Sequence, residues 1–535
     1  MKKTVEKTIY FYLLFVVYAA LLLFFCTKSS PLYVFNDYYD PNAYFTMGKG
    51  LMQGAVPYRD LFDHKGPFLY LLFGIGYLID HTGFIGIYLI EILSMSLVLI
   101  FAYKTALIYT ERPAVSCIIA LLVPIAMLSS GIFVTGADLG GGSADEFIAP
   151  LFMIALYLVI RTFRGKEQIT GGQGTMFLLG IIGGLVLMIK FNQFAMIVGL
   201  LAPLLIMLMF RQFKVFLQFA GCLAAGCIVS LLPYLIYALA TDSLRDFFEV
   251  YIRFNLVYGT SGTGNNLLHS LSAGLKGAID ILIHNFLIYT VVILFGLLYF
   301  IYKRRQDFVL NFSILLGFAL TAVAVCIQFF GYVLIPAMVF TLFGYLAAYD
   351  LFRSLRMSSS PGRTSPNRAM ISAFTVLFLF IFTVGNNGLI AQKINRATSS
   401  SNPIPCQQQV AEIIARDGEE NPTLLQVLFL DTGFYTAAEI VPTSRYFYLP
   451  NVSYQNYSDV FKGQYEDIAA GLNTYLVTTY EAKRNSTLDN VPMTAENYTA
   501  KFQNITAQNY ELDAVIKGTY NQEGITYYLY HIKEA

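Results

Sequence analysis

The run IYFYLLFVVYAALLLFFC at residues 9–26 is eighteen residues long and contains no charged side chain. Its length suits a helix that crosses a bilayer, which needs roughly 17 to 25 mostly apolar residues. Lys2 and Lys3 precede the run like the charged head of a signal peptide, but no small-residue cleavage site follows it before Pro31. We therefore predict an uncleaved first membrane span.

The rest of the chain has the composition of a membrane protein. Of its 535 residues, 56% are hydrophobic and 13% are charged, whereas about 25% of the residues in a soluble domain are charged. This composition excludes a soluble enzyme. With the further apolar runs that are long enough to span, we expect about eleven crossings. These runs lie at 84–105, 114–134, 147–161, 175–190, 194–210, 215–240, 279–302, 308–329, 331–351 and 369–390.

Charge and cysteine content exclude two further classes of protein. The formal net charge is +1, so no global field attracts nucleic acid. Of the six cysteines, only Cys406 lies in a polar region, which leaves no pair for an exposed disulfide. Neither a Cys-x-x-Cys nor a His-Glu-x-x-His motif occurs.

The orientation of the chain depends on residues 67–79. This apolar segment is short for a span and is typical of an interfacial or re-entrant helix. If it does not cross, the basic residues at the span ends fall mainly on one side, which the positive-inside rule makes cytoplasmic. The outer side then receives the loops 27–83, 135–146 and 241–278 and the tail. We expect a multi-pass plasma-membrane protein with a cytoplasmic N-terminus.

The composition changes to that of a soluble domain at residue 391. Polar, helix-compatible stretches such as 407–416 alternate there with strand-like runs, which predicts a small α/β domain. The strand-like runs lie at 424–430, 445–449, 475–479 and 525–532. The predicted fold class is an all-α polytopic membrane domain at 1–390 followed by an extracytoplasmic α/β domain at 391–535.

Charged side chains gather in the first two outer loops, and charges at a bilayer face are costly enough to suggest function. Tyr44, Met47 and Leu51 follow helical spacing, so 42–53 is predicted to form a helix lying on the membrane. The second loop reads GGGSADE at 140–146, with its acids at the start of the fourth span. The charged and histidine side chains of the first loop include Asp37, Asp40, Arg59, Asp60, Asp63, His64 and Lys65.

Three motifs follow the first span in a fixed order: Asp-x-x-x-Tyr at 40–44, Gly-x-x-Pro-Tyr-x-Asp at 54–60 and Lys-Gly-Pro at 65–67. This order resembles the GT-C membrane glycosyltransferases, and within them the family 39-like group of protein O-mannosyltransferases and lipid A aminoarabinose transferases. Members of the family move a sugar from a polyprenyl-phosphate carrier to an acceptor on the outer membrane face. The resemblance implies a GT-C fold and a hexosyl or pentosyl transferase acting on a cell-envelope or surface glycan, lipid or protein.

The resemblance also implies roles for single residues. Asp40 matches the first-loop catalytic aspartate of the family, with Asp37 as a competing candidate. Lys65 matches the lysine that binds the lipid-linked phosphate. Either Asp145 or Glu146 matches the acidic position of the second outer loop.

The chemistry of these residues supports the same roles independently of the family. Transfer to a hydroxyl group needs a base, and a carboxylate near lipid can have its pKa raised toward working pH. Departure of a lipid phosphate is accelerated by cations placed against its developing charge. Asp40 is therefore the first candidate for the base. The candidates for the phosphate are Lys65, Arg59, His64 and Lys190, and those for other substrate contacts are Tyr44 and Tyr58.

Cofactor use stays open at this stage. The carboxylates of Asp40 and Glu146 have oxygen ligands suited to magnesium, calcium or manganese, so a divalent cation is an alternative to metal-free transfer. Pro41 and Gly66 stand where relatives often have a second acid and a proline, and both differences bear on metal and donor use.

Other interpretations of the sequence remain. The acids at the start of the fourth span can complement a helix dipole, and Lys190 can extend its ammonium to the interface. The chain as a whole can be a transporter or lipid-sugar flippase, although transporters usually carry ionisable residues at the bilayer midplane. It can also be a non-catalytic subunit of envelope assembly, which would share the fold without needing Asp40.

Overall fold

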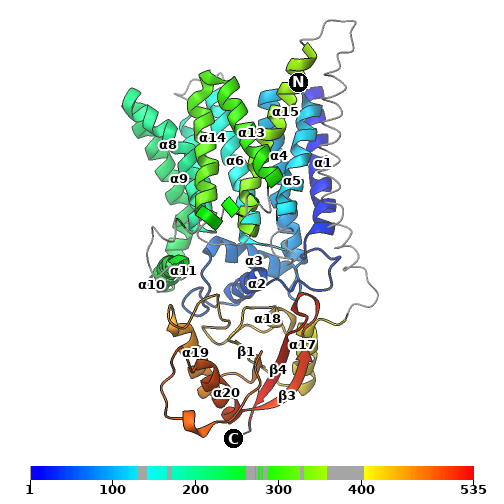
Figure 1. The fold of residues 1–535 in the computed structure, drawn as a ribbon, viewed down its shortest axis with the longest axis vertical. Coiled ribbons are helices and arrows are strands. Elements are labelled where there is room, and N and C mark those ends of the chain that lie inside the picture. Colours follow the sequence, from blue (N-terminus) through cyan, green and yellow to red (C-terminus); the bar gives the residue numbers. More distant parts are fainter. Residues whose placement is uncertain are drawn as a thin grey trace. The chain divides into compact units, whose positions relative to one another are not determined.

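The computed structural model describes residues 2–130, 141–164, 172–260, 287–325, 331–357 and 403–534, together with a few positions between 272 and 283. The described chain is mostly helical, with a small sheet near its C-terminus (Figure 1). The helices before the sheet are α1 (Lys2–Cys26), α2 (Tyr39–Met52), α3 (Pro67–Ile79), α4 (Ile85–Thr110), α5 (Pro113–Ser130), α6 (Ala144–Arg164), α7 (Gln173–Leu187), α8 (Phe194–Arg211), α9 (Phe213–Ala240), α10 (Leu244–Phe247), α11 (Asn255–Thr260), α13 (Leu287–Lys303), α14 (Phe308–Val325) and α15 (Thr341–Met357).

Several shorter or later elements also belong to the described chain. A π-helix, η3 (Phe248–Phe254), lies between α10 and α11, and the 3-10 helices η2 (Phe191–Gln193) and η5 (Gly331–Phe340) precede α8 and α15. The C-terminal helices are α17 (Cys406–Asp417), α18 (Phe434–Ala437), α19 (Ser458–Ala469) and α20 (Tyr498–Asn509), and the strands are β1 (Leu424–Val427), β2 (Tyr475–Thr478), β3 (Tyr510–Lys517) and β4 (Thr526–Ile532).

Among the described residues, seven helices are long and apolar enough to cross a membrane. Four further apolar helices, α3, α5, α7 and α13, are shorter. Each of the first ten predicted spans overlaps one of these helices, and the eleventh, 369–390, lies outside the described residues. The predicted mostly helical, multi-pass membrane architecture is therefore confirmed.

The chain divides into two compact units. The first unit comprises Met1–Thr27, Glu91–Leu232 and Leu271–Ser399, and the second comprises Lys28–Ile90, Pro233–Ser270 and Ser400–Ala535. The second unit thus combines the first predicted outer loop with the C-terminal residues. The predicted domain boundary at 390/391 lies outside the described residues, so the division into 1–390 and 391–535 stays a prediction.

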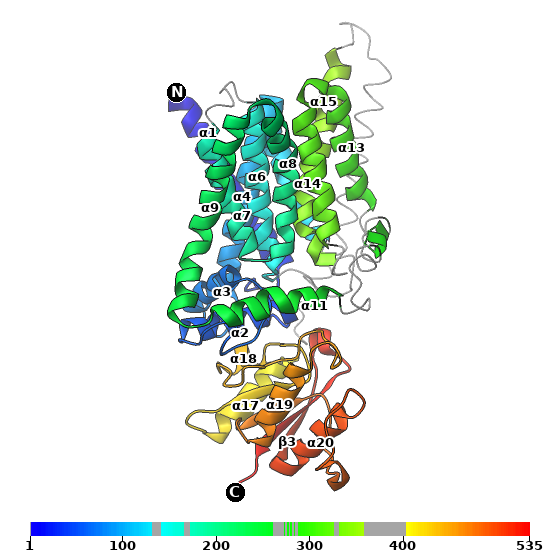
Figure 2. The ribbon, with the colours of Figure 1, turned by 90° about the vertical axis from the view of Figure 1, so that its left-hand side faces the viewer.

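Close helix packing holds the first unit together, and its long helices run side by side in both ribbon views (Figures 1 and 2). A Cβ atom added to Gly199 of α8 would come within 2.7 Å of the Cα atom of Gly317 in α14. Glycines allow helix backbones to approach this closely, and such approaches are typical of helices that associate in membranes.

The C-terminal sheet of the second unit has the strand order β1-β2-β4-β3. Strands β1 and β2 are parallel, and β4 is antiparallel to both β2 and β3. All residues of β1 and β2 are buried, which explains why both were predictable as short apolar runs. Helices α17, α19 and α20 lie around the sheet (Figure 1).

Three of the four predicted strand-like runs contain β1, β2 and β4, and the predicted helix at 407–416 is α17. The prediction of a strand at 445–449 is wrong, because this segment lies in irregular backbone. Its polar backbone groups bond elsewhere, for example from Leu449 N to Phe429 O at 2.9 Å. Strand β3 was not predicted, since most of it is exposed and a register shift between Leu512 and Ala514 interrupts its alternation.

Helix α2 contains most of the helix predicted at 42–53, but residues 41–50 are all buried. Residues 41–50 therefore leave no exposed apolar face for lipid, and the placement of this helix on the membrane stays a prediction. Burial comes from two sides within the unit. Helix α3 packs closely against it, since a Cβ atom on Gly48 would come within 2.7 Å of the carbonyl carbon of Phe73.

The C-terminal residues cover α2 through buried polar contacts. Thr46 Oγ1 donates to Asp431 Oδ2 at 2.8 Å, and Lys49 Nζ donates to the Tyr435 carbonyl at 2.8 Å. Lys49 is fully buried. Burial lowers the pKa of Lys49 to about 7, although Asp431 and Glu439 act in the opposite direction. A lysine held in this way fixes the docking of α18 against α2.

The contact at Gly48 yields a test of the α2–α3 packing. Gly48→Ala should destabilise the protein by about 1–3 kcal/mol, because the added methyl group meets backbone atoms that cannot rotate away. The measurement is the apparent melting temperature of the detergent-solubilised chain. Gly174→Ala in α7 is the matched control, because a Cβ atom there meets nothing within 4 Å. Equal melting temperatures for the two variants would contradict this packing.

Candidate functional site

Tyr58 holds the loop between α2 and α3 in one conformation. This residue has a positive φ of 70°, which is uncommon for a residue other than glycine. Its N–H donates to Leu61 O at 2.8 Å, and its hydroxyl donates to Lys65 O at 2.7 Å. The ring is fully buried and contacts Tyr70 and Tyr251. Tyr58 therefore fixes the conformation of this loop, and its contact with substrate stays a prediction.

Three consecutive buried residues, Asp63, His64 and Lys65, form a polar cluster after this turn. Lys65 Nζ lies 2.7 Å from His64 Nε2, and His64 Nδ1 lies 3.4 Å from Asp63 Oδ1. Because an ammonium group can only donate, Nε2 is the acceptor, which assigns the histidine proton to Nδ1. The order of the contacts, Lys65 to His64 to Asp63, links a cation to a carboxylate through a neutral imidazole.

Burial and neighbouring charges perturb this cluster in opposite directions. Burial lowers the pKa of His64, Lys65 lowers it further, and Asp63 and Asp40 raise it, with a net lowering. Burial acts to raise the pKa of Asp63, but contacts with His64, Lys65 and Tyr448 hold that pKa below its usual range. Asp63 is therefore ionised and His64 neutral near pH 7.

Asp63 is anchored from both sides. Tyr70 of α3 donates its hydroxyl to Asp63 Oδ2 at 2.8 Å, and Tyr448 donates to Asp63 Oδ1 at 2.5 Å. Asn255 Nδ2 donates to the carbonyl of His64 at 2.7 Å. Segments far apart in the chain thus converge on the residues that orient Lys65.

The candidate acids of the same loop lie at the start of α2. Asp40 belongs to the first turn, is half-buried and accepts a hydrogen bond from the buried Tyr44 at 3.1 Å. It interacts electrostatically with His64. Asp37 is buried, and its Oδ1 lies 2.6 Å from Lys28 Nζ. Asp40 therefore acts on His64 through its charge, while Asp37 forms an ion pair with Lys28.

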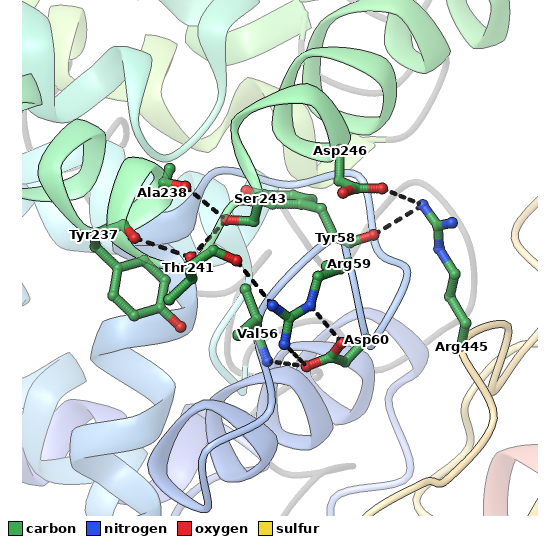
Figure 3. Close-up of polar contacts among 10 residues, drawn as sticks. All are labelled: Val56, Tyr58, Arg59, Asp60, Tyr237, Ala238, Thr241, Ser243, Asp246 and Arg445. Atoms are coloured by element: carbon green, nitrogen blue, oxygen red, sulfur yellow. Dashed lines mark hydrogen bonds and ion pairs between the residues drawn. The ribbon is translucent and has the colours of Figure 1, made fainter.

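Arg59, a candidate for phosphate binding, has other contacts (Figure 3). Its Nε lies 2.8 Å from Asp60 Oδ1, and its Nη1 donates to the Thr241 carbonyl at 2.8 Å. Arg445 links the same region through Asp246 and the Tyr58 carbonyl, at 3.1 and 3.0 Å. These contacts make Arg59 a brace between the first loop and the segment after α9.

The first unit holds the acids predicted in the second loop. Asp145 is fully buried in the first turn of α6, where Lys190 Nζ donates to its Oδ2 at 3.0 Å. Gln193 Nε2 donates to the other carboxylate oxygen at 3.1 Å. Lys190 is therefore the ion-pair partner of Asp145. This pairing argues against the alternative that Lys190 only extends its ammonium group to the membrane interface.

Glu146 has a different set of partners in that unit. Its Oε1 accepts from Ser143 N at 3.1 Å, and its carboxyl group interacts with that of Glu91 in α4. Thr27 donates to Glu91 at 3.0 Å. Glu91 lies within α4, and nothing in the sequence spacing indicates Glu146 as its partner.

Several site residues could not be recognised from the sequence. Tyr448 lies in the segment predicted as a strand, and only the structure places its hydroxyl on Asp63. For Asp63, the only signal in the sequence was its position next to a histidine, which could have indicated a site residue. Tyr70 and Asn255 carry no local signal.

Metal binding is not supported by a cluster in the described part of the chain. No group of three or more His, Cys, Asp or Glu side chains there is arranged to hold a metal ion. Asp40 and Glu146, the predicted ligands, belong to different compact units. Their joint use of a metal stays a prediction.

Solved structures similar to this chain identify the fold. ArnT from Cupriavidus metallidurans bound to undecaprenyl phosphate matches with a TM-score of 0.60 and 12% identity over 97% of each chain. The chain has a GT-C fold. The apo state of that ArnT matches with a TM-score of 0.59 and 12% identity over 96% of this chain and 97% of ArnT.

The oligosaccharyltransferase of Archaeoglobus fulgidus, in complex with zinc and sulfate, has a similar fold. It matches with a TM-score of 0.54 and 14% identity over 93% of this chain and 71% of its own. No protein-family model and no curated protein sequence matches the chain. The predicted GT-C fold is confirmed by these structures, and identities this low establish the fold alone.

The lowered pKa of His64 predicts a specific loss of stability in acid. The unfolded chain binds a proton near pH 6.5, above the folded pKa, so the free energy of unfolding falls as the pH drops through 6.5. The slope is at most about 1.4 kcal/mol per pH unit. His64→Gln should flatten the fall in apparent melting temperature between pH 7.5 and 5. The exposed His81 gives the control, and a His81→Gln profile as flat as that of His64→Gln would contradict the assignment.

Proposed function

We propose that this protein is an integral membrane glycosyltransferase that moves a sugar from a polyprenyl-phosphate carrier to an acceptor hydroxyl. The observation that carries the proposal is the cluster in which Asp40 interacts with His64 and His64 contacts Lys65. It supplies a carboxylate and a buried cation in one compact unit, as the transfer reaction requires. The GT-C fold supports the same reaction class.

The proposed step exchanges one bond at the anomeric carbon of the donor. The acceptor oxygen forms a new bond to that carbon while the bond from the carbon to the phosphate oxygen breaks. Asp40 accepts the proton of the acceptor hydroxyl, and polyprenyl phosphate leaves with the electron pair. Lys65 stabilises the negative charge that develops on the phosphate, which is worth more in a water-poor site than in solution.

The remaining cluster residues act on Lys65 and not on the substrate. A carboxylate that is buried and hydrogen-bonded by two tyrosines is a rigid anchor. Asp63 therefore orients the imidazole of His64, and the imidazole accepts from Lys65. This arrangement fixes the ammonium group before the donor binds, which is the property that electrostatic catalysis needs.

The donor class is supported by the fold neighbour, since ArnT from Cupriavidus metallidurans was solved with undecaprenyl phosphate. We place the reaction at the outer face of the plasma membrane, with a cytoplasmic N-terminus and the C-terminal domain outside, on the positive-inside distribution of Lys and Arg. The acceptor is then a cell-envelope or surface glycan, lipid or protein. The proposed step uses side chains of the protein alone, and the complex of the archaeal oligosaccharyltransferase with zinc makes a divalent cation the alternative to test.

Asp40→Asn should reduce sugar transfer by about 10²–10⁴-fold, the usual contribution of a general base. The amide can still accept the hydrogen bond from Tyr44, so the fold should survive. The assay follows transfer from a panel of labelled polyprenyl-phosphate sugars in membranes. Asp242→Asn is the control, because Asp242 is exposed and its positive φ of 52° suits asparagine equally. Undiminished transfer by Asp40→Asn would reject the proposed base.

Lys65→Gln should weaken the binding of undecaprenyl phosphate at least tenfold, since a charge-assisted contact with the phosphate is lost. Binding is measured by fluorescence with a labelled lipid phosphate in detergent. The exposed Lys462 gives the matched control, Lys462→Gln. Equal affinities for the two variants would exclude Lys65 from the phosphate site. If the wild-type protein also showed no sugar transfer, the result would favour an assembly subunit or a flippase.

A further inference from the structure

A cavity of about 520 Å³ opens in the second unit beside the sheet. Its wall includes residues 428–430, which directly follow β1, and Thr479, which directly follows β2. Ligands of open α/β sheets bind at the carboxyl ends of parallel strands, and this volume lies within the usual range of roughly 300–1,000 Å³ for ligand sites. The position and size of the cavity are therefore those of a binding site.

The chemistry of the wall is that of a carbohydrate site. None of the described residues that line the cavity is charged. Aromatic rings offer faces for the apolar side of a sugar ring, and hydroxyl and amide groups offer hydrogen bonds to its hydroxyls. The aromatic and polar lining residues include Tyr39, Phe429, Thr432, Asn451, Ser453 and Tyr527.

One polar group in the wall lacks a well-formed hydrogen bond. Thr432 is 2% exposed, and its hydroxyl makes no hydrogen bond of good geometry with the described residues. The neighbouring Tyr527 hydroxyl donates to Gln522, so it can only accept from Thr432, an interaction that acts to lower the pKa of Tyr527. The Thr432 hydroxyl therefore keeps lone pairs that can accept a hydrogen bond from a ligand hydroxyl in the cavity.

The wall also contains a strained residue. Leu428 has a φ of 62°, a conformation that costs a γ-branched residue of order 1–3 kcal/mol and that concentrates at ligand sites. Its N–H is fixed by Gln464 Oε1 at 3.1 Å. This strain turns the chain directly after β1, where it forms the wall.

The cavity reaches the start of α2, which carries the proposed base. Among the described lining residues, only Tyr39 lies outside the C-terminal residues of the unit, and it immediately precedes Asp40 at the start of α2. Tyr39 interacts with both Tyr527 and Asp37. Neither His64 nor Lys65 lines the cavity. The cavity thus reaches the residue that precedes the proposed base in the sequence, and it does not include the residues assigned to the donor phosphate.

We propose that this cavity binds an uncharged sugar unit of the acceptor. The inference rests on the proposed function, and it adds that the acceptor is a glycan with a neutral sugar near its reactive hydroxyl. The C-terminal residues then select the acceptor, because they supply every described residue of the wall except Tyr39.

The test uses the full chain in detergent and saturation-transfer NMR. The probes are methyl glycosides of glucose, galactose, mannose and N-acetylglucosamine, with methyl glucuronide as the charged counterpart of the glucoside. Asn451→Trp should fill the cavity from its exposed rim, and Thr432→Val removes only the hydroxyl. Asn490→Trp is the control, because Asn490 is exposed and does not line the cavity. Undecaprenyl phosphate binding is measured on every variant.

The expected result is saturation transfer to at least one neutral glycoside in the wild type and in Asn490→Trp. The signal should fall at least fivefold in Asn451→Trp and in Thr432→Val, while undecaprenyl phosphate binding is kept. The inference is overturned if no neutral glycoside binds, if the signal survives in Asn451→Trp, or if the glucuronide binds as well as the glucoside. Failure of the chain to bind undecaprenyl phosphate, with glycoside binding intact, would instead overturn the proposed donor and leave the sugar site standing.

Discussion

Asp63 carries a charge with almost no access to water, and such a charge is stable only when nearby donors replace its hydration. Tyr70, His64 and Tyr448 replace it, and Tyr448 lies 385 residues further along the chain. Removing one partner of a buried charge typically costs about 3–5 kcal/mol. The buried carboxylate of Asp63 therefore needs hydrogen-bond donors from both the first loop and the C-terminal residues, and this need holds the two segments together. The position of Lys65 depends on the same contacts.

The helices of this protein were largely predictable because a bilayer imposes their length and apolar content on the sequence itself. The buried strands β1 and β2 were predictable for a similar reason, since burial on both faces leaves an apolar run. Strand β3 was not, because exposed edge residues need no alternation. The burial of α2 by protein was also missed, because a helix covered by protein and a helix lying on lipid can have the same apolar spacing.

The candidate site was predictable residue by residue but not as an arrangement. Asp40, His64 and Lys65 were found because charged side chains near a membrane are few and stand out. Their partners were not, because a tyrosine or an asparagine that donates one buried hydrogen bond looks like any other in the sequence. The pairings of Asp145 with Lys190 and of Glu146 with Glu91 join separate spans, and local spacing carries no information about such contacts.

The two edges of the C-terminal sheet differ in how they avoid recruiting another chain. Strand β1 ends the sheet on one side, but all four of its residues are buried, so its unpaired backbone groups are covered. Strand β3 ends the other side in the open, where Glu511, Asp513 and Lys517 are charged and a register shift distorts the edge. Charges and irregularity both hinder strand addition. Copies crowded in one bilayer can therefore stay separate without any sheet-to-sheet polymerisation.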